Sequence, residues 1–118
     1  MILLRSALFH VLFHGWTTIC CLGLIWAPAL PRRYMMGLVK VYLWSLYGLE
    51  RLILGIDYRV LGRENLPDGP VIIAAKHQST WETLKLHLIL DDPAVVLKKE
   101  LLKIPIWGWF ARRAQMIP

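Results

Sequence analysis

The sequence has few cysteines, and these are poorly placed for chemistry. Cys20 and Cys21 are adjacent within an apolar run, and no other cysteine is present. Neighbouring cysteines are poorly arranged to bridge each other, so a disulfide framework and a cysteine metal site are both excluded. We interpret the two as small apolar residues that identify no cellular compartment.

Acidic side chains are also scarce, at 8 against 14 Lys and Arg, which gives a formal net charge of +6 over 118 residues. No signature of an RNA- or DNA-binding module is present. Hydrophobic residues make up 57% of the chain, above the roughly 45–50% of soluble domains. Beside so apolar a chain, basic residues more often face anionic lipid headgroups than nucleic acid. We therefore predict that the partner is a lipid bilayer and not a nucleic acid.

Charge is absent over residues 11–30. A helix needs about 20 apolar residues to cross a hydrocarbon core of about 30 Å. Arg5 precedes this stretch, whereas Arg32, Arg33 and Lys40 follow it. The heavier positive flank favours a cytoplasmic position for the C-terminal side, which predicts a protein of the inner (cytoplasmic) membrane.

A cleaved signal peptide is the alternative for this segment. Residues 27–29, Ala-Pro-Ala, resemble a signal-peptidase site, but the apolar run exceeds the roughly 7–15 residues of a signal core, and we favour an anchor.

His10 and His14 would share a helix face as a possible metal pair. Because no third ligand is nearby, we interpret them as histidines near a membrane interface and predict no metal site.

Residues 34–56 are again apolar with helical spacing, but their uncharged part, residues 41–49, is too short to span a membrane. Tyrosine and tryptophan side chains within them suit the headgroup region. We predict an interfacial helix that packs back on the first one, so that residues 1–55 form a membrane-associated helical hairpin. The alternative is an ordinary buried helix of a globular core.

The pattern then changes to that of an α/β domain. Residues 57–61 alternate polar and apolar side chains, as a half-buried strand does, and residues 71–75 are apolar enough for a central strand. A helical pattern over residues 81–90 and a second buried strand at residues 94–97 follow. Pro105 is suited to the first position of a last helix.

A candidate site lies where the strand at 71–75 gives way to the helix at 81–90. Ligands of α/β sheets bind outside the carboxyl ends of strands, which is where His77 stands. A histidine can take a proton near neutral pH, and a carboxylate on its other nitrogen, here Glu82, fixes the tautomer and stabilises the imidazolium. Glu82 also fits a capping box with Ser79, and the two roles can coexist.

Residues 76–82, Lys-His-Gln-Ser-Thr-Trp-Glu, resemble the first motif of the glycerolipid acyltransferases, and specifically of bacterial 1-acyl-glycerol-3-phosphate acyltransferases. That pattern is a histidine, four residues and an acid, usually with serine two residues after the histidine. Residues 99–101, followed by Pro105 and Gly108, resemble a further stretch of this family. The hydrophobic N-terminus matches as well, so that the resemblance covers nearly the whole chain.

The resemblance implies transfer of an acyl group from acyl-CoA or acyl-carrier protein, as co-substrate, to the free hydroxyl of lysophosphatidate in phospholipid synthesis. It implies His77 as general base and Glu82 as its orienting partner. The family normally has aspartate at the second place, so Glu82 is a departure that alters reach. Ser79, Lys98 and Lys99 are candidate substrate-binding residues, the lysines for phosphate; a solvated basic face is the alternative.

Family members continue with an arginine-bearing segment for the acceptor phosphate and a glutamate-glycine motif, and neither occurs here. Residues 56–118 are few for a sheet that must bury both faces. We expect them to be the N-terminal part of an acyltransferase domain with an incomplete sheet, inactive by itself. A small membrane-anchored protein without catalysis, and an acyltransferase for another lysolipid, are the alternatives.

Overall fold

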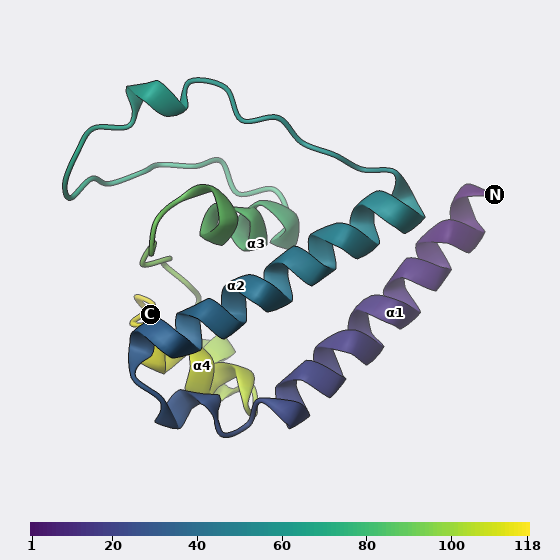
Figure 1. The fold of residues 1–118 in the computed structure, drawn as a ribbon, viewed down its shortest axis with the longest axis horizontal. Helices are drawn as coiled ribbons and strands as arrows, with labels where there is room; N and C mark the ends of the chain where they lie inside the picture. Colours follow the sequence, from purple (N-terminus) through teal and green to yellow (C-terminus); the bar gives the residue numbers. More distant parts are fainter.

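The computed structural model describes residues 1–118 and consists of helices and loops (Figure 1). Its elements, in chain order, are α1 (Ile2–Gly23), η1 (Ala27–Ala29), α2 (Arg32–Leu49), η2 (Glu50–Leu54), η3 (Arg63–Asn65), α3 (Thr80–Ile89), η4 (Lys99–Lys103) and α4 (Trp107–Arg113). The segment η2 is a π-helical continuation of α2, which ends where Gly55 takes a left-handed conformation with φ of 70°. The other η segments are short 3₁₀ helices.

The predicted helical hairpin is present. The helices α1 and α2 run in opposite directions and are joined by η1 (Figure 1). The Trp16 indole Nε1 donates to Ser45 Oγ at 2.7 Å, and the hydroxyls of Thr17 and Tyr42 lie 2.9 Å apart. Two polar contacts therefore link the facing surfaces of the two helices.

The helix α1 is the element that is long and apolar enough to cross a membrane, a test that an N-terminal signal sequence also passes. None of its residues is buried within the protein. Its bounds differ from the predicted span of residues 11–30, because it begins at Ile2 and ends at Gly23. The Gly23 carbonyl accepts from the Trp26 indole at 2.8 Å, and Pro28 lies in η1, so the helix does not continue to residue 30.

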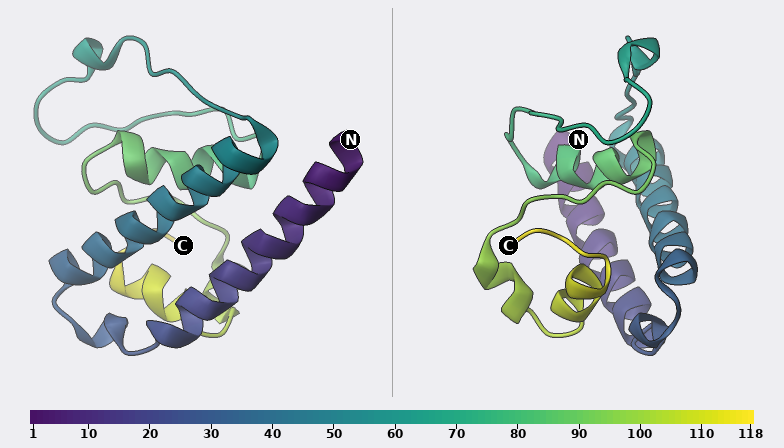
Figure 2. Two further views of the ribbon diagram at one scale, coloured as in Figure 1. Left: turned by 45° about the vertical axis from the view of Figure 1, so that its right-hand side comes forward. Right: turned by 90° about the vertical axis from the view of Figure 1, so that its left-hand side faces the viewer.

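The core is small, with 11 of 118 residues buried, and it lies at the turn of the hairpin. Ala27, Met35, Met36 and Ala114 form its buried cluster. The first comes from η1, the two methionines come from the start of α2, and the alanine follows α4. The views in Figures 1 and 2 agree that α4 lies beside this turn. The last helix is thus packed against the hairpin.

The strands predicted at residues 57–61 and 71–75 are not formed, and the α/β class is not confirmed by this structure. Both segments belong to the wide loop that connects η2 to α3 (Figure 1). Ile72, predicted to be central in a sheet, is 97% exposed. A strand needs a neighbour that satisfies its backbone N–H and C=O groups, and neither segment meets one among residues 1–118.

One trace of parallel pairing occurs at the segment predicted as a strand at residues 94–97. Val96 and Ile117 form an isolated parallel bridge. The Leu97 amide donates to the Ile117 carbonyl at 2.8 Å, and the Ile117 amide donates to the Val95 carbonyl at 3.1 Å. Between the paired segments the chain passes through η4 and α4, which is the helical crossover that parallel strands require.

The two later helices were predicted with unequal accuracy. The pattern over residues 81–90 is confirmed as α3. The last helix begins at Trp107 and not at Pro105, because Ile106 has a φ of 64° that interrupts helical geometry. Gly108 approaches the Leu102 carbonyl so closely that a Cβ atom would lie 2.2 Å from it. The turn from η4 into α4 is therefore tighter than an uninterrupted helix allows.

Candidate active site

The capping box predicted at the start of α3 is present. The Trp81 amide donates to Ser79 Oγ at 3.2 Å. Glu82 Oε1 accepts from the Ser79 amide at 2.7 Å, and Glu82 Oε2 accepts from the Ser79 hydroxyl at 2.8 Å. These bonds satisfy backbone donors that the first turn of a helix leaves free. Glu82 is thus held at a defined position by the helix that carries it.

The same carboxylate contacts His77. The distance from His77 Nδ1 to Glu82 Oε1 is 2.9 Å, so one oxygen makes both the capping contact with Ser79 and the contact with His77. The side chain of Glu82 is 23% exposed and that of His77 is 75% exposed. A side chain at the third helical position must reach back past the N-cap to make both contacts. The longer glutamate, which departs from the family pattern, makes both contacts here.

The electrostatics of the helix start keep this carboxylate ionised. The backbone N–H of Ser79 is the main cause that lowers the pKa of Glu82 to about 2, with further hydrogen bonds from its own amide, the Gln78 amide and the Ser79 hydroxyl. At neutral pH the carboxylate is an anion that can only accept, so the contact requires Nδ1–H to donate. A neutral imidazole then carries its lone pair on Nε2.

The predicted substrate-binding residues are brought together only in part. His77, Glu82 and Lys98 line one large groove of about 1940 Å³, whereas Ser79 and Lys99 do not. The hydroxyl of Ser79 both donates and accepts within the capping box. Lys98 and Lys99 are exposed at the start of η4. Of the groove's 45 lining residues 29 are hydrophobic, so its walls suit an apolar ligand.

A buried charged cluster beside this site was missed from the sequence. Lys85 Nζ lies 2.6 Å from Glu50 Oε2, with side-chain exposures of 3% and 6%. The ammonium also faces the rings of Tyr47, Trp81 and Tyr58, with centroids at 4.6, 5.4 and 5.7 Å. The available signal was a carboxylate, Glu50, within one apolar helical stretch and an ammonium of opposite sign, Lys85, within another.

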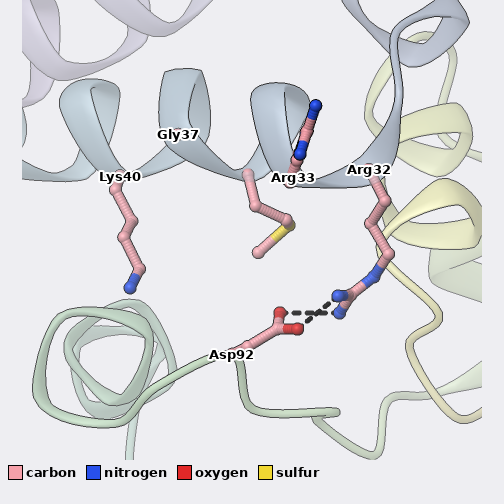
Figure 3. Close-up of a pocket in the computed structure, with 6 residues that line it drawn as sticks. Arg32, Arg33, Gly37, Lys40 and Asp92 are labelled. Carbon is pink, nitrogen blue, oxygen red and sulfur yellow. Dashed lines mark hydrogen bonds and ion pairs between the residues drawn. The ribbon is translucent and has the colours of Figure 1, made fainter.

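The basic residues that follow the hairpin turn are partly neutralised within the protein. Figure 3 shows the Arg32 guanidinium facing Asp92, with two hydrogen bonds between them, one of 2.7 Å. Arg32 also donates to the Ala114 carbonyl at 3.1 Å. The hydrogen bond from Arg32 lowers the pKa of Asp92. Arg32 therefore ties the start of α2 to the segment that follows α3, in addition to flanking the apolar helix.

His10 and His14, considered as a possible metal pair, both lie on α1. The rings of His10 and His14 are stacked with centroids 6.1 Å apart. No group of three or more possible metal ligands is found in the structure.

Comparison with known proteins places the site in a family context. Residues 57–118 match the family model described as Acyltransferase, and this range includes His77 and Glu82. The chain is 40% identical over 112 residues to the 1-acyl-sn-glycerol-3-phosphate acyltransferase of Pseudomonas aeruginosa, and 42% identical over 65 residues to that of Saccharomyces cerevisiae. The matches cover 90% and 54% of this chain, but only 42% and 22% of those relatives. No solved structure matches this chain.

Proposed function

Because this chain belongs to the acyltransferase family, we propose that the protein transfers an acyl group from acyl-CoA or acyl-carrier protein to the free hydroxyl of lysophosphatidate. The observation that carries the proposal is the His77 Nδ1–Glu82 Oε1 contact of 2.9 Å beside an apolar groove. A structural role accounts for the bonds between Ser79 and Glu82. It does not account for a histidine held by its Nδ1 with its other nitrogen free.

His77 would act as the general base of this transfer. As the lipid hydroxyl oxygen attacks the thioester carbonyl, Nε2 takes the hydroxyl proton and the imidazole becomes an imidazolium. Glu82 would stabilise that imidazolium through Nδ1–H and keep the ring oriented. Collapse of the tetrahedral intermediate then breaks the C–S bond, and the proton on Nε2 leaves with the thiol. The acyl group ends on the lipid oxygen as an ester.

The groove and its basic edge would hold the substrates. Its apolar lining suits the acyl chains of a lysolipid and of the donor. Lys98, which lines the groove, would contact a phosphate, and Lys99 would contribute positive potential beside it. Ser79 would act on substrate only indirectly, through the position of Glu82.

The hairpin would place this site at a membrane surface. The exposed apolar side chains of α1, such as Ile2, Leu3 and Val11 at 81%, 85% and 70%, are unfavourable in water and suit a lipid environment. The basic residues after α1 support an orientation in which the His77 side faces the cytoplasm at the inner membrane. A membrane-bound lysolipid would then reach the site without leaving the bilayer.

The test is an acyl transfer assay on the complete protein in membranes, with acyl-CoA and acyl-carrier protein as donors and several lysolipids as acceptors. His77→Ala should lower turnover about 10²–10⁴-fold, because the general base is lost. His14→Ala is the matched control, since that histidine is exposed on α1 and should leave turnover unchanged. Unchanged turnover in His77→Ala would overturn the assignment, and preference for another lysolipid would replace the acceptor.

A further inference from the structure

The helix that carries Glu82 is attached to the hairpin through a buried charged contact. Glu50 lies in the π-helical segment η2 at the end of α2, and Lys85 lies one turn after Trp81 on α3. Glu50 Oε2 accepts from Lys85 Nζ at 2.6 Å and from the Trp81 indole Nε1 at 3.2 Å. A single carboxylate oxygen thus contacts two successive turns of α3.

Two anchoring points on one helix restrict both its rotation and its movement along its axis. Trp81 immediately precedes Glu82, so a rotation of α3 that displaced the indole from Glu50 would also turn Glu82 away from His77. His77 is itself exposed and lies in a loop, and its contact with Glu82 reaches it from α3. The position of α3 therefore determines whether the imidazole is oriented.

Buried ion pairs are a weak source of stability, because desolvation of both charges offsets their attraction. Their best-attested role is to specify one arrangement among several apolar packings. The pair of Glu50 and Lys85 has that character, since Lys85 is enclosed by aromatic rings and Glu50, and a shift of the helix along its axis would leave both charges unpaired. π-helical turns such as η2 also occur frequently at functional sites.

We propose that Glu50, Lys85 and Trp81 form a positioning cluster that fixes α3 against the end of α2 and so holds Glu82 within reach of His77. Its effect on turnover rests on the proposed acyl transfer, whereas its effect on geometry does not. Lys85 and Glu50 touch no reacting atom in this account. They act through Glu82.

The first measurement is kinetic, on the complete protein in phospholipid vesicles. Lys85→Met should lower kcat by about 100-fold with KM unchanged, since misplacement of a catalytic group by about 1 Å costs that much. Lys85→Arg retains the charge and should restore most of the loss. Lys40→Met is the matched control, because the pair of Lys40 with Asp91, 3.8 Å apart, also joins α2 to the end of α3 but is exposed and should leave kcat unchanged.

A double-mutant cycle separates positioning from general damage. In a Glu82→Gln background, Lys85→Met should cause no further loss of kcat, because the residue through which it acts is already disabled. An equal loss in both backgrounds would overturn the proposal. If Lys85→Met does not fold, the double mutant Glu50→Met with Lys85→Met replaces it, because removing both charges leaves neither buried without a partner. Wild-type kcat in that double mutant would also overturn the proposal.

The second measurement does not depend on activity. The amides of Gln78 and Ser79 donate to Glu82, so hydrogen exchange at these two positions reports the capping geometry. Lys85→Met should accelerate exchange at both, and Lys40→Met should not. If the wild type transfers no acyl group, the proposed function fails and exchange alone decides the positioning role. Unchanged exchange in Lys85→Met refutes that role whatever the activity.

Discussion

The close approach of α4 to η4 predicts that one glycine cannot be replaced without a loss of stability. A Cβ atom at Gly108 would lie 2.2 Å from the Leu102 carbonyl oxygen, 2.8 Å from its carbon and 3.3 Å from the Leu102 Cα. All three are backbone atoms, so no side-chain rotation relieves the contact. Gly108→Ala must therefore displace α4 or η4.

The magnitude follows from two opposing effects. Overpacking costs about 1–3 kcal/mol, and the better helix propensity of alanine returns at most about 1 kcal/mol. The midpoints of these ranges leave a net loss of about 1.5 kcal/mol, and each kcal/mol lowers Tm by roughly 4 °C in a chain of 118 residues. Gly48→Ala, in α2, is the matched control. Nothing lies within 4 Å of its added methyl group, so it should gain about 0.5–1 kcal/mol.

The assay is thermal unfolding in mild detergent, followed by circular dichroism of the helices. The reasoning requires the two alanine variants to shift Tm in opposite directions. Gly108→Ala with a Tm at or above that of Gly48→Ala would refute the tight contact between η4 and α4.

Two predictions concern pH. Burial lowers the pKa of His87, whose charged neighbours are Asp92 and Lys40, so the unfolded chain binds the proton more readily and stability should fall as pH drops below about 6.5. His87→Leu should reduce the fall of the urea unfolding midpoint with falling pH. The same dependence of that midpoint on pH in both proteins would contradict the prediction. The pKa of Glu82 is lowered to about 2, so the capped start of α3 should persist above the ordinary value of 4.5 and be lost as pH falls towards 2. The carboxyl shift of Glu82 in NMR should show that midpoint, and Ser79→Ala should raise it; an unmoved midpoint would mean that the hydroxyl contributes nothing.

The parts of the site that could be predicted were local. His77, Ser79 and Glu82 lie within six residues, where capping chemistry and chain geometry leave few arrangements, and their pattern carried both the capping box and the family resemblance. The position of α3 followed from its apolar spacing. The sequence left open whether Glu82 contacts Ser79, His77 or both, and in the structure one oxygen contacts both.

The strand predictions failed because a strand depends on partners distant in the chain. The segments at 57–61 and 71–75 have the composition of strands, but composition cannot supply the neighbouring backbone that a strand needs. The C-terminal end of α1, by contrast, was missed for a local reason. The Trp26 indole donates to the Gly23 carbonyl and Pro28 follows, and hydropathy alone detects neither feature.

By itself, the amino-acid sequence determined the apolar hairpin, the family and the short pattern of His77, Ser79 and Glu82, because each depends on neighbours within a few turns of chain. Only the tertiary structure decided that Glu50 meets Lys85 and Trp81, the latter 31 residues away, and that Val96 pairs with Ile117. Such contacts arise when packing excludes water around two segments at once. That exclusion is a property of the folded surfaces and is not encoded in either segment alone.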